Sequence, residues 1–135
     1  MNFMKILVLS LIFLFSSVAF ASDDEDGGAR MTFTEKDHDF GDIISGEVAE
    51  HVYTFQNTGT DTLRIATVYS SWGCTASLLS SEVVAPADSG EIKVSFNSKY
   101  RHGDYKKTIT VYSNDTEEPV IRLSLKISVL DAEEE

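Results

Sequence analysis

The stretch Ile121-Arg122-Leu123-Ser124-Leu125-Lys126-Ile127-Ser128-Val129 decides the fold, because apolar and polar residues alternate strictly along it. A period of two places the apolar side chains on one face of an extended strand and the polar side chains on the other. The same alternation runs through Ile92-Lys93-Val94-Ser95-Phe96, and β-branched and aromatic residues fill Thr108-Ile109-Thr110-Val111-Tyr112. These three segments predict β-strands with one buried face each.

Further strand-like runs lie at residues 52–55 and 63–68, and turn-forming residues separate the runs. The turns contain Gly, Asn, Asp and Ser, which tolerate left-handed backbone angles or hydrogen-bond their own backbone. Their spacing predicts about seven short strands and an all-β, two-sheet β-sandwich, and no segment shows a helical period. We expect a core built from these residues: Phe33, Phe40, Tyr53, Phe55, Leu63, Ile65, Ile92, Val94, Phe96, Ile109, Val111, Leu123 and Leu125.

The N-terminal segment predicts export. A weakly basic start is followed by an apolar run over residues 6–20 and by Ala19-Phe20-Ala21, which supplies the small residues that signal peptidase reads. The apolar run is shorter than the roughly 20 residues that a membrane-spanning helix needs. We expect residues 1–21 to be a cleaved signal peptide, with an uncleaved anchor as the alternative. The protein is then periplasmic or extracellular, with no membrane insertion after cleavage.

Two acidic segments flank the expected domain. Residues 22–30 and 131–135 combine like charges with little apolar surface, which predicts flexible tails around a single domain at residues 31–130. The 135-residue chain has a net charge of −11. That charge argues against nucleic acid as a partner, because such binding depends on basic residues that neutralise phosphates. It indicates either simple solubility or a protein partner with a basic face.

The order of several short motifs resembles a large bacterial family. They include His38-Asp39-Phe40-Gly41-Asp42-Ile43, Tyr53-Thr54-Phe55-Gln56-Asn57-Thr58-Gly59, Gly73-Cys74-Thr75 and Ser113-Asn114-Asp115. The family consists of exported Ig-like domains of unknown function, similar to the hydin-like (ASH) and major sperm protein domains. The resemblance covers residues 36–129 and implies an immunoglobulin-like β-sandwich with a binding or structural role and no established enzyme activity.

The chain departs from the family pattern at three places. The family usually has Cys-Gly-Cys-Thr where this chain has Trp72-Gly73-Cys74-Thr75, so no role of paired thiols carries over. The usual Pro-Gly turn is Pro86-Ala87, and we expect the positive φ angle to fall elsewhere, at Gly90. The glycine often found near the end of the last strand is absent, which predicts a more regular final strand.

Cys74 is the only cysteine, so the chain can form no internal disulfide. A lone cysteine is more often a small buried hydrophobe than a nucleophile, and a nucleophile would need a base such as His38, His51 or His102. The three histidines are too widely spaced in sequence to suggest local chelation. We therefore expect no catalytic residue, no cofactor and no metal site, and a protein that is not an enzyme.

Two loops are candidates for an interaction surface. The first contains Trp72, Gly73, Cys74 and Thr75, and the second contains Tyr100, Arg101 and His102. Tryptophan is a frequent anchor at interfaces because it buries a large area and keeps one donor for a polar contact. The competing interpretation is that Trp72 folds over one end of the sandwich and covers the core.

These observations lead to one functional hypothesis and one alternative. The hypothesis is a non-enzymatic, exported Ig-like binding or structural module of the cell envelope, with a protein partner of unknown identity. The alternative is a metal- or ligand-handling periplasmic protein that uses Cys74 with a histidine. We expect a monomer, and a dimer linked through Cys74 remains open.

Overall fold

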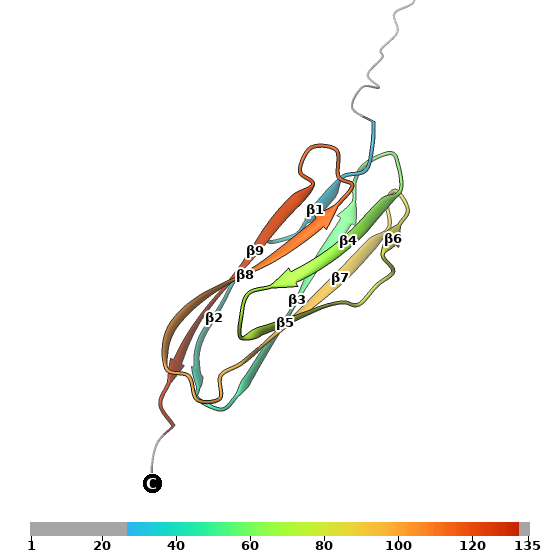
Figure 1. Cartoon of the computed structure of the whole chain (residues 1–135). Helices are drawn as coiled ribbons and strands as arrows, with labels where there is room; N and C mark the ends of the chain where they lie inside the picture. The colour runs from blue at the N-terminus through green and yellow to red at the C-terminus, as the bar shows by residue number, and fades with distance from the viewer. Residues whose placement is uncertain (1–26, 133–135) are drawn as a thin grey trace, which may run out of the picture.

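The computed structural model describes residues 27–132, which form two β-sheets packed face to face (Figure 1). This described part contains nine strands and no helix, so it includes no helix that could span a membrane. The predicted all-β sandwich is confirmed, and seven of its nine strands have five or more residues. The expected signal peptide lies outside the described residues.

The two sheets contain four and five strands. The four-stranded sheet is antiparallel and has the order β1 (Met31–Phe33), β3 (Val48–Asn57), β7 (Ser89–Asn97), β5 (Cys74–Leu78). The five-stranded sheet has the order β2 (Asp37–Ile44), β9 (Val120–Leu130), β8 (Gly103–Ser113), β4 (Leu63–Ser70), β6 (Val83–Val84). Within it β2 pairs in parallel with β9, so a strand near the start of the sandwich lies beside the last strand.

Strand β9 has the regularity that its sequence predicts. Every second residue from Ile121 to Val129 is buried, and the pairing with β8 runs from Gly103↔Val129 to Tyr112↔Val120 without a register shift. The irregularity on its other side belongs to β2, whose register shifts between Asp39 and Asp42. β9 therefore serves as a straight support between β2 and β8.

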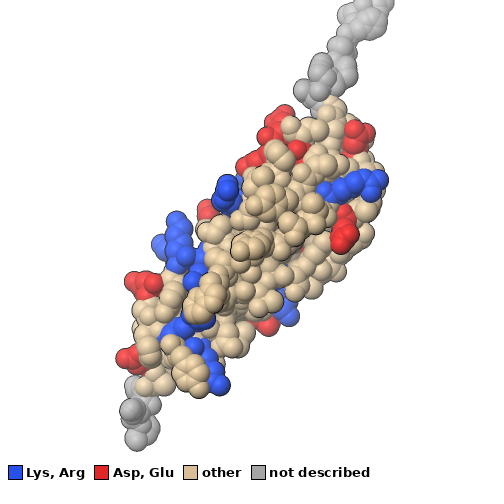
Figure 2. Space-filling view, in the orientation of Figure 1, with Lys and Arg blue, Asp and Glu red and all other residues tan. Residues whose placement is uncertain are grey.

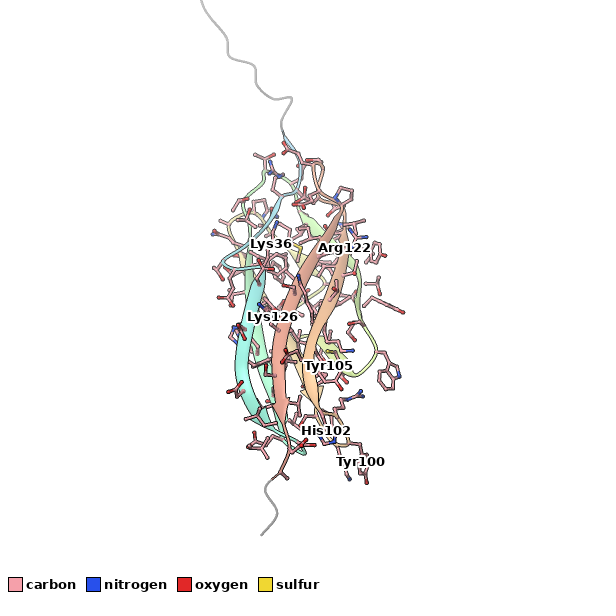
Figure 3. All side chains as sticks on the ribbon, turned by 90° about the vertical axis from the view of Figure 1, so that its left-hand side faces the viewer. Lys36, Tyr100, His102, Tyr105, Arg122 and Lys126 are labelled. Carbon is pink, nitrogen blue, oxygen red and sulfur yellow. The ribbon has the colours of Figure 1, made fainter. Side chains whose placement is uncertain are left out.

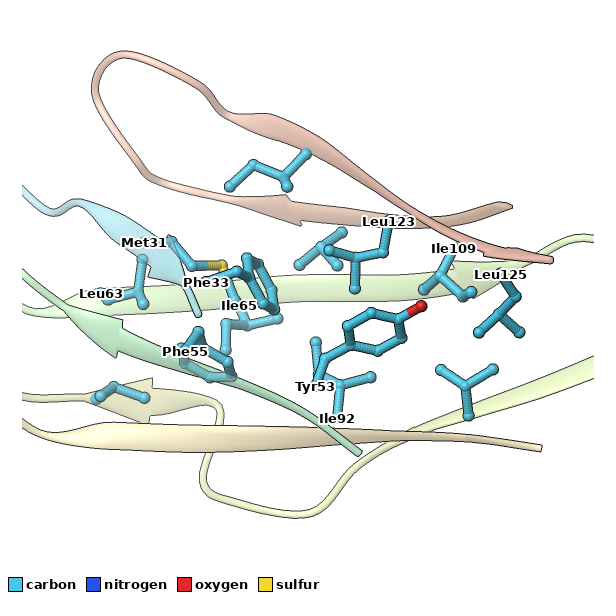
Figure 4. Close-up of a cluster of buried hydrophobic side chains, with 14 of the residues drawn as sticks. Met31, Phe33, Tyr53, Phe55, Leu63, Ile65, Ile92, Ile109, Leu123 and Leu125 are labelled. Atoms are coloured by element: carbon cyan, nitrogen blue, oxygen red, sulfur yellow. The ribbon is translucent and has the colours of Figure 1, made fainter. Parts of the chain in front are cut away.

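The core fills the space between the sheets (Figure 4). All the expected core residues are buried except Phe40, which is only partly buried because it lies on the edge strand β2. Tyr53 lies at the centre with no exposed surface, and its hydroxyl donates a 2.6 Å hydrogen bond to the Ser124 carbonyl oxygen. The core also includes residues outside our expected set: Ala29, Met31, Ala49, Val84, Ile121, Ile127 and Val129.

Two expectations about the backbone need correction. Gly28 and Ala29, which we assigned to the flexible tail, are buried, and the Gly28 and Ala29 carbonyl oxygens accept hydrogen bonds from the Thr60 and Thr116 amides. The positive φ angle of the Pro86-Ala87 turn falls on Ala87 itself, at 78°, and not on Gly90. Gly90 is required for a different reason, because a Cβ atom there would overlap the Phe55 ring.

Two connections that pass from one sheet to the other carry side chains of the candidate sites. Residues 34–36 connect β1 to β2, and residues 71–73 connect β4 to β5. The described chain begins at the upper end of the sandwich in Figure 1 and ends at the lower end, where Asp131 pairs with His102 of the β7–β8 connection. The two ends of the described chain are therefore at opposite ends of an elongated domain.

Candidate functional site

The connection from β4 to β5 is a tight turn that presents Trp72 to solvent. The Cys74 amide donates to the Ser71 carbonyl oxygen at 3.1 Å, which closes a four-residue turn, and Gly73 has a φ angle of +93°. A positive φ at the third position of such a turn favours glycine. Ser71 holds the turn to β8, because its amide and hydroxyl group both pair with the Thr108 backbone at 3.0 Å. Trp72 thus projects from a rigid support.

The connection from β7 to β8 is held by a buried serine. The Ser98 hydroxyl donates to the Glu47 carbonyl oxygen at 2.7 Å and accepts from the Gly46 amide at 2.9 Å. The Arg101 amide closes a turn onto the Ser98 carbonyl oxygen at 3.0 Å. Tyr100 adopts a left-handed φ of 63°, which aims its side chain away from the sandwich, as Figure 3 shows.

Arg101 joins the two connections. Its Nε atom donates to the Asn97 carbonyl oxygen at 3.0 Å, and its guanidinium lies 4.3 Å from the centre of the Trp72 ring. Lys107, from β8, places its ammonium 5.8 Å from the same ring. Both are cation–π distances, and a cation over tryptophan is the most favourable form of this contact. The two candidate loops therefore form one surface, although they are distant in sequence.

This Trp72 surface, defined as Trp72, Tyr100, Arg101 and Lys107, is open to solvent. The exposed fractions are 76% for Trp72 and 85% for Tyr100. In Figure 2, several Lys and Arg side chains lie along the lower left of the face in view, with Asp and Glu side chains at the margin beside them. The surface thus combines apolar area with positive charge.

An open groove separates two strands that the Trp72 turn connects. It lies between β4 and β5, has a volume of about 240 Å³, and is lined by both strands and by Glu82. The apolar lining side chains that reach it include Val68 on β4 and Ala76 and Leu78 on β5. The groove marks where the two sheets separate, because β4 and β5 belong to different sheets.

The remaining residues of the candidate loops have different roles. Trp72 does not cover the end of the core, which removes the interpretation that it plugs the sandwich. Gly73 packs below the guanidinium, since a Cβ atom there would lie 3.2 Å from a terminal nitrogen of Arg101. Thr75 is exposed on β5, and His102 pairs with Asp131 at 2.5 Å instead of joining the Trp72 surface.

Cys74 behaves as part of the core boundary. It is half-buried and packs against the core cluster, and burial raises the pKa of its thiol while Lys107 and Arg101 oppose that shift. A raised pKa leaves less thiolate, which is the reactive form. The group of three potential metal ligands within residues 27–132 does not include Cys74.

The sequence argument missed a second cluster. The structure brings His38 of β2 and His51 of β3 into contact with Glu35, although the two histidines are 13 positions apart in sequence. Burial, and then the neighbouring His38, lower the pKa of His51, while Glu35 acts in the opposite direction. The only signal in the sequence was the alternation along the strand, which places His51 on the same face as the buried Ala49 and Tyr53.

The fold and the loops define a single immunoglobulin-like β-sandwich domain with an exposed aromatic and cationic surface. Residues 31–129 match the family described as "Protein of unknown function (DUF1573)", and the chain belongs to that family. Comparison with the curated proteins found no match.

Solved structures share the fold at low sequence identity. A protein of unknown function from Porphyromonas gingivalis W83 has 18% identity and a TM-score of 0.67, over 76% of this chain and 48% of that chain. The ASH/PapD-like domain 7 of human CEP192 has 16% identity and a TM-score of 0.61, over 90% and 99% of the two chains. The secreted serine protease VesC from Vibrio cholerae has 19% identity and a TM-score of 0.60, over 82% and 25%. This chain thus spans about half of the first protein and a quarter of the protease.

Proposed function

We propose that the protein is a non-enzymatic, exported binding module of the cell envelope, and that the Trp72 surface takes an acidic segment of a protein partner. The observation that carries the proposal is the exposed Trp72 indole held beneath the Arg101 guanidinium, with Lys107 beside it. These cations and large aromatic side chains lie together on a protein whose net charge is −11.

Energetics favour binding at this surface. Tryptophan, tyrosine and arginine are the residues that most often contribute above about 2 kcal/mol each to an interface. The Ser71 and Ser98 contacts hold both loops in place before any partner arrives, which reduces the entropy cost of association. Positive charge at the surface selects an acidic partner segment and speeds the encounter.

The chemistry of Cys74 supports a binding role over catalysis. A nucleophilic cysteine needs a lowered pKa and an adjacent base, whereas burial raises the pKa of Cys74. Its contacts are with core residues. For the same reason the alternative in which Cys74 and a histidine handle a metal gains no support from the geometry.

The test compares two charge reversals of equal size. Envelope extract from the source cells is passed over the immobilised wild-type chain, Arg101→Glu and Arg122→Glu. Arg122 is an exposed residue of β9, so its reversal changes the net charge equally without touching the Trp72 surface (Figure 3). We expect a specific acidic protein to be retained by the wild type and by Arg122→Glu and lost with Arg101→Glu.

A quantitative step follows with that protein or its acidic segment. Trp72 is the only tryptophan, so its fluorescence reports directly on occupancy of the surface. We expect Arg101→Glu, followed by this fluorescence, and Trp72→Phe, which lacks the reporter and is followed by calorimetry, to raise the dissociation constant by at least about tenfold, which corresponds to roughly 1.4 kcal/mol. Equal capture by all variants, or no specific capture by the wild type, would contradict the proposal. N-terminal sequencing of the exported chain tests cleavage after Ala21.

A further inference from the structure

One edge of the sandwich, where β2 faces β3, brings together residues from both sheets. After β1 the chain leaves the four-stranded sheet, and residues 34–36 carry it across to β2 in the other sheet. Glu35 lies in this crossing. The backbone on either side is fixed, because the Thr34 amide donates to the Thr54 carbonyl oxygen at 3.0 Å and the Ser124 amide donates to the Lys36 carbonyl oxygen at 2.8 Å. At this point of the fold, the crossing therefore contacts both β3 and β9.

At that point two histidines from opposite sheets meet. The rings of His38 and His51 are stacked, with centroids 3.5 Å apart and planes within 8° of parallel. The same Glu35 carboxylate oxygen, Oε1, lies 2.8 Å from His51 Nε2 and 3.5 Å from His38 Nδ1. The potential ligand atoms of the three side chains all lie within 4.8 Å of one another. Their side chains are 45%, 28% and 19% exposed for Glu35, His38 and His51, so solvent reaches the cluster.

The surroundings restrain both rings. Phe40 packs edge-on against His38, and Tyr53 packs edge-on against His51, each with centroids 4.7 Å apart. The Tyr53 hydroxyl is engaged by the Ser124 carbonyl oxygen, and the Ser124 hydroxyl donates to Asp37 at 2.6 Å. The two rings thus lie between aromatic neighbours, and a change in their tilt requires these edge-on contacts to shift.

The local charge favours a cation. Lys36, which follows Glu35 in the chain, lies near the start of β2 in Figure 3 and directs its ammonium to Glu118, 3.5 Å away. Asp37 and Asp39 lie on the same strand as His38. Glu35 therefore carries a negative charge that its neighbour in sequence does not neutralise. His51 Nε2 donates its proton to this carboxylate, and metal binding displaces that proton and makes the nitrogen lone pair available.

We propose that Glu35, His38 and His51 bind a divalent transition-metal ion of the zinc class. Two imidazole nitrogens and one carboxylate oxygen form a donor set that suits such ions. With metal–ligand distances of about 2.0–2.1 Å, ligand atoms in a tetrahedral site lie about 3.4 Å apart. The carboxylate-to-nitrogen distances of 2.8 and 3.5 Å bracket this value. Because nitrogen lone pairs lie in the ring planes, binding turns the rings out of their parallel stack. Three protein ligands leave a position for water or for a ligand from a partner.

The experiment uses the full chain without an affinity tag that contains histidine. Zinc is added as its chloride and binding is measured by calorimetry for the wild type, Glu35→Gln, His38→Asn, His51→Asn and His102→Asn. His102 is the matched control, because it is the third histidine and pairs with Asp131 away from the cluster. We expect one zinc per chain. Loss of either His38 or His51 should weaken binding by more than the roughly 10–100-fold that loss of an outer-shell partner costs.

A stability measurement guards against variants that fail to fold. At free zinc a hundred times above the dissociation constant, the melting temperature of the wild type and of His102→Asn should rise by roughly 10 °C. Glu35→Gln changes a half-exposed side chain and keeps an amide oxygen that can accept from His51, so this variant should fold normally while losing most of the rise. The proposal is overturned if the wild type binds no zinc. It is also overturned if His38→Asn, His51→Asn and Glu35→Gln bind as the wild type does, which would assign the ion to the acidic segments.

Discussion

Cys74 shows how position within a sheet decides the chemistry of a single residue. Its thiol packs against the core while its two flanking cations lie on the solvent side, and burial has the larger effect on its pKa. From the sequence alone, Cys74 could equally be a reactive cysteine in a loop. Only the pairing of Cys74 with Phe96 in β7, which the sequence does not give, places it at the core boundary.

We expect the Cys74 thiol in the native chain to react with iodoacetamide several-fold more slowly at pH 8 than in the urea-unfolded chain. A raised pKa means that the folded state keeps the proton to higher pH, so the native rate should still be rising at a pH where the unfolded rate has levelled off. Lys107→Gln removes a cation that opposes this shift and should slow the reaction further. Mass spectrometry of labelled peptides checks the rates.

The control for this prediction is Arg122→Gln. Arg122 is not one of the charged residues that shift the pKa of Cys74, so this change should leave the labelling rate unchanged. Immediate labelling of the native chain at the unfolded rate would contradict the assignment of Cys74 to the core boundary. Mass analysis of the unreduced sample also tests the expected monomer against the Cys74-linked dimer.

Within the Pro86–Gly90 turn, two positions favour a small residue for two different reasons. Ala87 has a φ of 78°, a conformation that costs a residue with a Cβ atom about 1–2 kcal/mol. Gly90 has ordinary angles, but a side chain there would overlap Phe55 and Ser80. Sequence reasoning located the turn and misassigned its strained position, because close packing and a left-handed angle both select glycine.

We expect Ala87→Gly to raise the free energy of unfolding by less than about 1 kcal/mol, because relief of strain is partly offset by the greater freedom of glycine in the unfolded chain. Gly90→Ala should lower it by about 1–3 kcal/mol through overpacking. Urea unfolding of both variants, followed by far-ultraviolet circular dichroism, measures the two opposite changes. A Gly90→Ala variant as stable as the wild type would show that the Phe55 ring can move aside.

The β8–β9 connection depends on Asp115, which is only 4% exposed. Its carboxylate accepts hydrogen bonds from the Met31 amide at 2.7 Å and from the Glu117 and Glu118 amides at 2.8 Å, with Arg30 3.6 Å away. The sequence predicted this turn from Asn114 and Asp115. It gave no sign that Asp115 also holds β1, because that contact spans 84 residues.

We expect Asp115→Ala to lower the free energy of unfolding by about 3 kcal/mol, since it leaves buried backbone donors without a charged acceptor. Asp115→Asn keeps one accepting oxygen and should cost less. Thr116→Ala, next in the chain and exposed, serves as the control and should change stability by under about 0.5 kcal/mol. Similar losses for Asp115→Ala and Thr116→Ala would contradict the role assigned to the carboxylate.

For the whole molecule, the period of two along each strand was enough to predict the fold class and most of the core. It could not predict which strands pair. The Trp72 surface and the Glu35–His38–His51 cluster both arise where the chain crosses between sheets, so their members meet only after the sandwich has formed. The candidate loops were therefore found separately, and the histidine cluster was missed.

The parallel pairing of β2 with β9 makes the two ends of the fold interdependent. β9 lies between β2 and β8, and its Ile127 and Val129 are buried. A chain that ends at Leu130 keeps all of these contacts and should be as stable as the full chain. A chain that ends at Lys126 loses two buried side chains, each contributing about 1.5–3 kcal/mol, together with the backbone pairing to Asp42–Ile44 and Gly103–Tyr105. Because domains of this size have only about 5–15 kcal/mol of stability, we expect the shorter chain to be largely unfolded at 37 °C. Circular dichroism and hydrogen exchange distinguish the cases, and a folded shorter chain with β2 amides still protected would show that β2 does not depend on this end of β9.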